Sequence, residues 1–317
     1  MSMGRKFRTL LKENKYLVTP GVPTPLHAMI VEKAGFKFVY VGGHDVSITL
    51  LGMPDVGFLT QSEMTMNARH IASSVSIPVV VDADTGYGNA VNTMRTVRDF
   101  EAAGVAAIHI EDQESPKRCG YMAGKTLVST EEAVGKLKAA MAARRDKDFV
   151  IIGRTDAISA VGGGLDEAIA RGKAFAAAGC DMVMPIFSTP DLEQPRRFAE
   201  AIHAEYPDVM LYFLYASLMK WRESRIPFDD IAALGYKAMH VSLVGLRLIM
   251  QPFWDYAVDM QKRGAEAEFD LEEQTIGHPM ADILAFEGFP AIKELEKQYL
   301  PADAVDLKYG TAAAKRG

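Results

Sequence analysis

Short runs of apolar residues alternate along this chain with longer amphipathic stretches. Runs of this length, bounded by polar or Gly-containing segments, predict buried strands. Eight of them are expected, at Tyr16–Thr19, Phe38–Val41, Val79–Ala83, Ala106–Ile110, Phe149–Gly153, Met182–Pro185, Met210–Leu214 and Ala238–Val241. Between strands, the pattern predicts helices that include Val91–Ala103, Thr130–Arg144, Glu167–Ala178 and Leu192–Ala204.

The strand–helix alternation predicts an α/β fold with a parallel sheet covered by helices. Eight such units favour a closed (β/α)8 barrel of the TIM type over the main alternative, an open doubly wound sheet. The helix ends support this interpretation. Gly104 and Gly179 stand where a left-handed C-cap precedes a strand, and Ser129 stands where an N-cap begins a helix.

The segment after the barrel has a different pattern. It is charged and mostly helical, as at Phe253–Lys262 and Pro290–Tyr299, and it carries apolar residues that a barrel does not need. We therefore assign residues 1–250 to the barrel and 251–317 to a helical extension of the same domain. The extension is expected to pack on the barrel and on a partner subunit, which predicts a homo-oligomer, either a dimer or a tetramer.

Composition narrows the class of protein. The chain has 317 residues, 49% of them apolar, which is enough for a large core. Its net charge of −6 argues against nucleic acid or an anionic membrane as a partner. The basic N-terminus leads into no signal-peptide core, and no apolar run is long enough to span a membrane. With only Cys119 and Cys180, no disulfide framework is indicated, and a soluble cytoplasmic protein is expected.

Carboxylates end two neighbouring predicted strands. Asp82 and Asp84 end the third strand, and Glu111 and Asp112 end the fourth. Strand alternation sends Asp82 and Asp84 to the same side, and the next strand lies about 4.8 Å away, so Glu111 can face the same volume. Clustered acids need a compensating cation, and ligands that are all oxygen favour Mg²⁺ or Mn²⁺. Separate solvated carboxylates or structural ion pairs are the alternative, which we prefer for Asp112.

The loop Pro116–Tyr121 carries a candidate reactive thiol. Nearby cations are expected to lower the pKa of Cys119, and Gly120 and Gly124 suggest that the loop moves as a lid over the site. The cations are Lys117, Arg118 and Lys125. The alternative is an incidental cysteine, the interpretation that we adopt for Cys180.

Arg154 ends the fifth predicted strand and is expected at the same mouth. Its guanidinium is suited to bidentate binding of a substrate carboxylate, or to an ion pair with Glu111 or Asp156, and both interpretations stay open.

The Gly-rich turn Thr85–Asn89 matches neither phosphate-loop nor dinucleotide patterns, so a tight turn is preferred over a phosphate cradle. No ligand role is assigned to the histidines without metal-ligand spacing, His27, His70, His203, His240 and His278.

Five segments together resemble the isocitrate lyase/phosphoenolpyruvate mutase superfamily over nearly the whole chain. The likeness is strongest to its methylisocitrate lyase, dimethylmalate lyase and carboxyphosphonoenolpyruvate mutase branch. The segments are Gly52–Gly57, Val81–Gly88, His109–Gln113, Pro116–Gly120 and Arg154–Ala157. The resemblance implies a Mg²⁺-dependent barrel, commonly tetrameric, with helices exchanged between subunits.

The resemblance also implies residue roles. Asp82 and Asp84 would hold the metal directly or through water, with Glu111 and Asp55 in the surrounding network. Arg154 would bind substrate, and Cys119 on the gating loop would protonate the departing enolate. The expected reaction is cleavage of a 2-hydroxy di- or tricarboxylic acid to pyruvate or glyoxylate plus a carboxylate. The alternatives are a mutase or hydrolase of phosphonopyruvate-type substrates, an oxaloacetate decarboxylase or hydrolase, and a carboxylate-binding barrel without catalysis.

The chain departs from the lyase pattern around the substrate. Gly42-Gly43-His44-Asp45 stands in place of Ser-Gly-Gly, Tyr121 in place of a histidine, and Ile186 in place of a glutamate. An asparagine is also missing from the seventh strand, at Tyr212–Tyr215. A less polar or larger substrate than methylisocitrate is therefore expected. Its predicted contacts are Tyr40, Gly42, Gly43, His44, Asp45, Gly120, Tyr121 and Arg154. Lys117 joins Cys119 and Arg154 as a catalytic candidate, and Lys117, Tyr87 and Tyr121 are candidate bases that would need a lowered pKa.

Overall fold

A computed structural model describes residues 1–309 of the chain. Contacts between its residues divide it into two compact units, Met1–Ile249 and a C-terminal unit that begins at Met250. The first unit contains all eight strands and the candidate site, and the second contains helices. Each unit is described by itself below.

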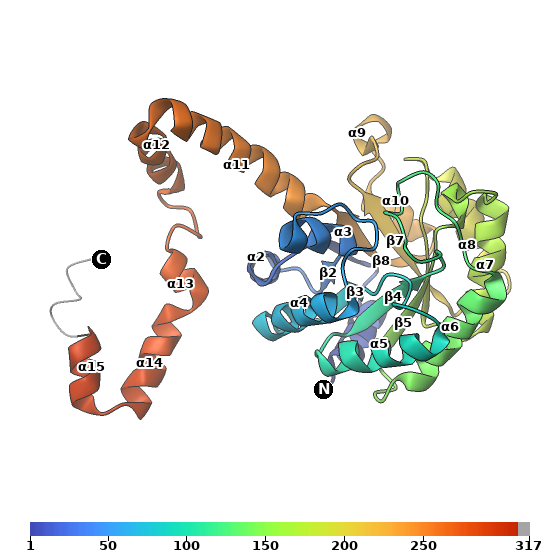
Figure 1. Cartoon of the computed structure of the whole chain (residues 1–317), viewed down its shortest axis with the longest axis horizontal. Coiled ribbons are helices and arrows are strands. Elements are labelled where there is room, and N and C mark those ends of the chain that lie inside the picture. The colour runs from blue at the N-terminus through green and yellow to red at the C-terminus, as the bar shows by residue number, and fades with distance from the viewer. Residues whose placement is uncertain (310–317) are drawn as a thin grey trace. The chain divides into compact units, whose positions relative to one another are not determined.

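Eight parallel strands form the centre of the first unit (Figure 1). Neighbouring strands follow the order β1-β8-β7-β6-β5-β4-β3-β2, and the sheet closes between β1 and β2 through a bridge from Gly21 to Tyr40. This nearly closed barrel confirms the prediction over an open sheet. The strands are β1 Leu17–Pro20, β2 Val39–Val41, β3 Val79–Asp82, β4 Ala107–Glu111, β5 Val150–Thr155, β6 Met182–Pro185, β7 Met210–Ala216 and β8 Tyr236–Ser242.

Helices surround the barrel, and those predicted lie within two residues of the observed bounds. Capping explains several of the starts: Asn89 forms a capping box with Asn92 at α5, and Ser129 accepts a bond from the Glu132 amide at α6. The helices are α1 Met3–Glu13, α2 Pro25–Lys33, α3 Gly43–Val46, η1 Ser47–Leu51, α4 Gln61–Ser74, α5 Ala90–Ala102, α6 Thr130–Ala143, η2 Ala157–Ser159, α7 Leu165–Ala177, α8 Glu193–His203, α9 Trp221–Ser224 and α10 Phe228–Ala233.

Two apolar clusters make up the core. Val81 belongs to the outer cluster, where strands pack against helix residues such as Phe100. Val80, the neighbour of Val81 on β3, belongs to the inner cluster. Phe7 and Leu11 of α1 are completely buried in that inner cluster, so α1, which the sequence pattern did not predict, completes the interior of the barrel. Filling the interior makes the barrel a packed scaffold for side chains at its carboxyl end.

The C-terminal helices leave much of their apolar surface exposed. They are α11 Val244–Arg263, α12 Ala265–Thr275, α13 Ile283–Glu287, α14 Phe289–Tyr299 and α15 Ala302–Tyr309. No residue of α14 is buried, and Phe253 and Trp254 of α11 are 67% and 69% exposed. Within residues 1–309, no helix has both the length and the apolar character needed to cross a membrane.

Candidate functional site

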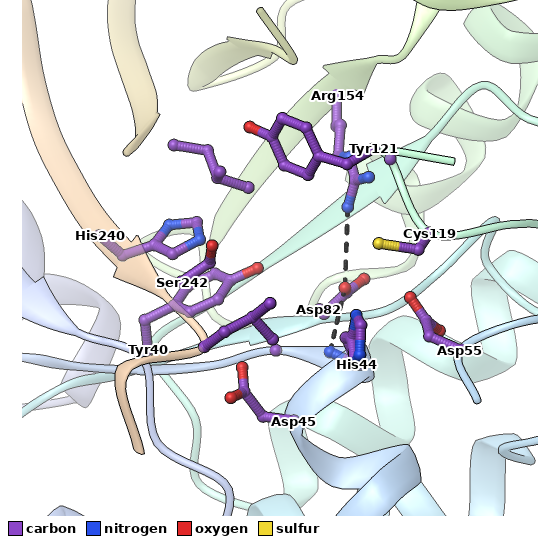
Figure 2. Close-up of a pocket in the computed structure, with 15 residues that line it drawn as sticks. Tyr40, His44, Asp45, Asp55, Asp82, Cys119, Tyr121, Arg154, His240 and Ser242 are labelled. Atoms are coloured by element: carbon purple, nitrogen blue, oxygen red, sulfur yellow. Dashed lines mark hydrogen bonds and ion pairs between the residues drawn. The ribbon is translucent and has the colours of Figure 1, made fainter. Parts of the chain in front are cut away.

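A pocket opens where the strands end, and its residues come from several elements (Figure 2). The cavity, with its open mouth, measures about 430 Å³. All eight predicted substrate contacts line it: Tyr40, Gly42, Gly43, His44, Asp45, Gly120, Tyr121 and Arg154. Asp55, Asp82 and Cys119 line it too, whereas Lys117, Asp84 and Glu111 lie behind the lining. Figure 2 shows the Cys119 thiol and the Arg154 guanidinium pointing into the same space.

Glycines bring backbone close to the charged groups of the pocket. A Cβ added to Gly43 would lie 3.1 Å from both Asp82 Oδ2 and Asp84 Oδ1, and the Gly43 amide donates a hydrogen bond to Asp82 Oδ2. A Cβ added to Gly120 would lie 2.8 Å from Arg154 Nη2. A side chain at either position would therefore crowd these groups, and glycine leaves the Asp82 carboxylate and the Arg154 guanidinium in place beside the pocket.

Asp82 and Asp84 lie near each other, although not for the predicted reason. Strand β3 ends at Asp82, and Asp84 has a φ of 46° in the left-handed region. The Asp84 amide donates to Asp82 Oδ1 at 2.9 Å, which closes a tight turn. The expectation that strand alternation aligns the two carboxylates is wrong, because the chain turns before alternation could apply.

Two buried cations are ion-paired with the carboxylates. Lys117 Nζ lies 2.5 Å from Asp55 Oδ1 and 2.9 Å from Asp84 Oδ1. On the other side, Arg154 Nη2 lies 3.0 Å from Glu111 Oε2. The same guanidinium contacts Asp156 at 2.9 Å and approaches Asp82 at 3.7 Å. The predicted ion pairs of Arg154 with Glu111 and Asp156 are therefore both present.

Carboxyl groups outnumber cationic side chains in this cluster. Four buried carboxylates, those of Asp55, Asp82, Asp84 and Glu111, face Lys117 and Arg154, and Arg154 is also shared with Asp156. Burial raises the pKa of Asp84 to about 7 and that of Glu111 well above its usual value. Neither Glu111 oxygen accepts a well-aligned hydrogen bond. Oxygen ligands with surplus negative charge suit a hard divalent cation, so these residues fit Mg²⁺ or Mn²⁺.

The side chains that lie close enough together to bind one metal ion directly are not Asp82, Asp84 and Glu111. Among residues 1–309, the side chains that bring three potential ligand atoms within 4.8 Å of one another are His44, Asp55 and Cys119. Asp82, Asp84 and Glu111 do not belong to that group. The ammonium of Lys117 and the guanidinium of Arg154 contact those three carboxylates instead.

Cys119 does not have the lowered pKa that its cationic neighbours suggested. Burial raises the pKa of this thiol, whose residue is 8% exposed. Both lysines are already paired: Lys117 binds Asp55 and Asp84, and Lys125 binds Asp156 and the Gly120 carbonyl oxygen. The predicted lowering of the thiol pKa is therefore wrong, and the residue holds its proton at neutral pH.

The three candidate bases are also contradicted. Burial raises the pKa of Tyr87 and of Tyr121 well above the usual value for tyrosine. Burial alone would lower the pKa of Lys117, but Asp84 and Asp55 outweigh it and raise that pKa well above its usual value. None of the three has the lowered pKa that a base near neutrality requires.

His240 is a pocket residue that the sequence analysis left out. It lines the cavity from β8, its ring stacks on Tyr40 with 3.4 Å between centroids, and neither of its ring nitrogens has a hydrogen-bond partner. Burial lowers its pKa far below the usual value. Alternation along β8 could have indicated this position. His240 and Ser242 are two residues apart, so their side chains lie on the same face of the strand, and both line the pocket.

Asp112 and the turn at Thr85–Asn89 both have the structural roles predicted for them. Asp112 accepts hydrogen bonds from Thr155 Oγ1 at 2.7 Å and the Asp156 amide at 2.9 Å, and it pairs with Arg171, which confirms its structural role. The turn at Thr85–Asn89 contains Tyr87 at a φ of 56° and ends at the N-cap of α5. It is thus a tight turn, as predicted.

Comparison with known proteins gives consistent matches. The family model for phosphoenolpyruvate phosphomutase matches residues 7–256. A 2,3-dimethylmalate lyase from Eubacterium barkeri is 46% identical over 236 residues, which cover 74% of this chain and 78% of that one. An isocitrate lyase from Haloferax volcanii is 36% identical over 299 residues, which cover 94% and 87%. A phosphonopyruvate hydrolase crystallised with oxalate and Mg²⁺ superposes with a TM-score of 0.81 at 30% identity, covering 95% and 100%.

Proposed function

Because this chain belongs to the isocitrate lyase/phosphoenolpyruvate mutase superfamily, we propose that it is a Mg²⁺- or Mn²⁺-dependent oxo-acid lyase. Its substrate would be a 2-hydroxy di- or tricarboxylic acid. Cleavage of one carbon–carbon bond would release a 2-oxo acid, pyruvate or glyoxylate, and a second carboxylate. The main observation behind the proposal is that Asp82, Arg154 and Cys119 line the same pocket. The buried carboxylates near this pocket also outnumber the cations that pair with them.

Asp82, Asp84 and Glu111 would hold the divalent ion, directly or through water, with Asp55 in the surrounding network. When bound, the ion supplies Lewis-acid stabilisation of negative charge on the substrate oxygens. The residues already provide the surplus negative charge that such an ion needs. Lys117 would remain ion-paired to both Asp55 and Asp84.

Arg154 and Cys119 would orient the substrate and donate a proton to the product. Arg154 would orient a substrate carboxylate, since its guanidinium lines the pocket and offers planar donors. Once the substrate hydroxyl has given its proton to solvent water, the electron pair of that O–H bond forms the new carbonyl. The electrons of the breaking carbon–carbon bond leave with the other fragment as an enolate. Cys119 would donate its S–H proton to the enolate carbon, a role that the raised pKa of the thiol suits.

One side of the pocket supports a substrate with an apolar substituent. Leu214 and Leu243 are among the residues that line the pocket. A Cβ on Gly120 would lie 3.4 Å from the Ile186 side chain, so the residue that replaces the usual glutamate is close to the site. Apolar side chains bind alkyl groups better than a third carboxylate. This arrangement favours alkyl-substituted hydroxy acids within the proposed class.

A second candidate is a phosphonopyruvate-type mutase or hydrolase, or an oxaloacetate decarboxylase or hydrolase. It is supported by the similarity to the phosphonopyruvate hydrolase, which covers 95% of this chain. The similarity to the two carbon–carbon lyases, together with a protonated Cys119 in the pocket, favours the lyase. A carboxylate-binding barrel without turnover is the third candidate.

A substrate panel separates these candidates. Chelator-treated protein would be offered 2,3-dimethylmalate, methylisocitrate and isocitrate, with and without added Mg²⁺. Release of pyruvate or glyoxylate would be followed by coupled reduction of the 2-oxo acid. Mg²⁺-dependent release from a hydroxy acid supports the lyase. Consumption of phosphonopyruvate seen by ³¹P spectroscopy, or decarboxylation of oxaloacetate, without hydroxy-acid cleavage would replace it with the second candidate. Oxalate binding with no turnover at all would favour the third.

A further inference from the structure

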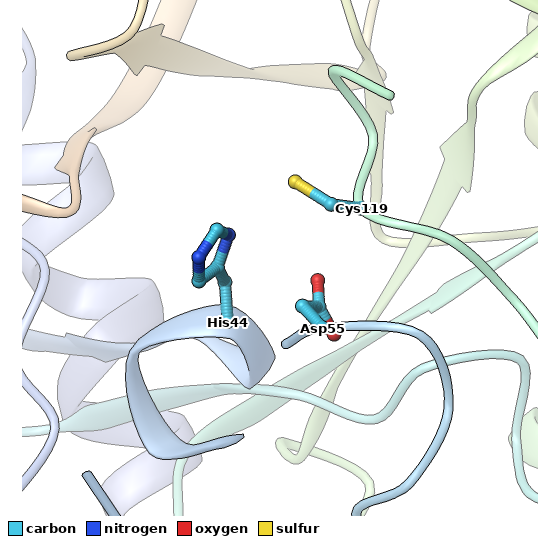
Figure 3. Close-up of side chains that lie close together, drawn as sticks. All are labelled: His44, Asp55 and Cys119. Atoms are coloured by element: carbon cyan, nitrogen blue, oxygen red, sulfur yellow. The ribbon is translucent and has the colours of Figure 1, made fainter. Parts of the chain in front are cut away.

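We propose that His44, Asp55 and Cys119 form a second metal site, selective for a borderline divalent ion such as Zn²⁺, beside the oxygen-ligand site of Asp82, Asp84 and Glu111. The three side chains come from different segments: His44 from α3, Asp55 from the segment after η1, and Cys119 from the loop after β4. One ligand atom of each lies within 4.8 Å of the others. In Figure 3 the Cys119 thiol points toward the His44 ring, with Asp55 beside both.

The donor set decides which ion binds. Thiolate, imidazole and carboxylate are the ligands that Zn²⁺ takes, and three protein ligands leave a fourth position for water or a small anion. Sulfur and nitrogen donors discriminate against Mg²⁺, which prefers oxygen. Asp82, Asp84 and Glu111 offer only oxygen. The pocket and the carboxylates behind it therefore offer two donor sets of different chemical hardness.

The three ligands are held near one another without a metal. The Cys119 amide donates a hydrogen bond to the Asp55 carbonyl oxygen at 3.0 Å, which ties the loop to the Asp55 segment. Lys117 binds Asp55 through Oδ1, and the carboxylate has a second oxygen to offer. The buried His44 Nδ1 has no hydrogen-bond partner. Metal binding would therefore not have to break a hydrogen bond of the His44 Nδ1 atom.

The three ligand atoms would have to move only slightly closer together to bind a zinc ion. Bond lengths of about 2.0–2.3 Å in a tetrahedral zinc site place ligand atoms roughly 3.3–3.8 Å apart. In the structure the three ligand atoms lie within 4.8 Å of one another, so they have to approach by about 1 Å. Rotation of the side chains can close this distance. On binding, Cys119 would lose its S–H proton to solvent and form a sulfur–metal bond. This would remove the proton that the proposed reaction needs, so the ion would act as a reversible inhibitor.

Co²⁺ is a suitable probe because thiolate ligation gives it a near-ultraviolet charge-transfer band, whatever the enzyme's activity. Chelator-treated protein would be titrated with Co²⁺ in excess Mg²⁺, which fills the oxygen site. We expect the band to appear, to vanish when Zn²⁺ is added, and to persist in Cys180→Ala, the matched control that removes the other thiol. Cys119→Ser should abolish it, and His44→Asn should weaken Co²⁺ binding at least about tenfold.

The opposite results overturn the site. No charge-transfer band in the wild type, a band that survives Cys119→Ser, or unchanged Co²⁺ affinity in His44→Asn would each do so. His44 is only partly buried, so His44→Asn is expected to fold, and circular dichroism checks this. Because the readout is spectroscopic, the metal site can be tested even if the proposed lyase reaction is wrong.

Discussion

The Lys117 ammonium lies 2.9 Å from Asp84 Oδ1, and both side chains are buried. This ion pair joins the loop that carries Cys119 to the turn that follows β3. The same ammonium reaches Asp55 at 2.5 Å. A single lysine thus neutralises part of the carboxylate cluster and fixes the position of the candidate acid relative to it.

Replacing this lysine tests the charge balance. Lys117→Met would leave Asp55 and Asp84 buried beside each other without a cation. We expect the free energy of unfolding to fall by about 3–5 kcal/mol, the usual loss when one partner of a buried pair is removed. Added Mg²⁺ should restore more stability in the variant than in the wild type, because the variant has more uncompensated negative charge.

Urea denaturation with and without Mg²⁺ measures both effects. Lys138→Met, at an exposed position of α6, is the matched control and should change stability by less than about 0.5 kcal/mol. An equal loss in both variants, or a Mg²⁺ effect no larger than in the wild type, would contradict the charge argument.

Cys119→Ser tests the proton donor. The serine hydroxyl is a far weaker acid than the thiol, so we expect kcat to fall by a factor of about 10²–10⁴. The rise in melting temperature on Mg²⁺ addition should remain, because Cys119 is not among the proposed magnesium ligands. Unchanged turnover would remove Cys119 from the mechanism, and Cys180→Ala serves as the thiol control.

Gly120→Ala tests the close approach of the loop to Arg154. The new Cβ would lie 2.8 Å from Arg154 Nη2 and 2.9 Å from Asp156 Oδ1, so the guanidinium has to shift. We expect a loss of about 1–3 kcal/mol in stability and a raised KM, since Arg154 is proposed to orient the substrate.

Gly135→Ala is the matched control for that change. Gly135 lies inside α6, with nothing within 4 Å of the added Cβ, and the substitution should stabilise the protein by about 0.5–1 kcal/mol. Steady-state kinetics and urea denaturation compare the two variants. A KM for Gly120→Ala equal to that of the wild type would show that the close approach is not needed.

The exposed apolar residues of the C-terminal unit predict self-association. Phe253 and Trp254 are adjacent and mostly exposed, a combination typical of an interface. Light scattering should give a mass at least twice the 34.7 kDa of one chain, and a Phe253→Ser/Trp254→Ser double variant should lower it. A monomeric mass for the wild type would refute the predicted homo-oligomer.

Much of the fold and pocket lining could be predicted because the signals are local. Hydrophobic periodicity located the strands to within two residues, as at Met182–Pro185, which matches β6. Once eight parallel strands are expected, residues after the strand ends must share one face of the barrel. This geometry explains why Arg154, which ends its predicted strand, lines the pocket, whereas Gly43 was expected there from the resemblance of its loop to the lyase substrate loop.

The sequence alone therefore determined the barrel and the set of residues around its mouth, since both follow from repeating patterns along the chain. Only the tertiary structure decided how those residues affect one another. Burial raises the pKa of the Cys119 thiol, and Lys117, although near it in sequence, pairs with Asp55 and Asp84. His240 of β8 stacks on Tyr40 of β2, a contact between strands far apart in the sequence. The physical reason is that charge pairing and burial depend on distances through space, which the spacing of residues along a chain does not encode.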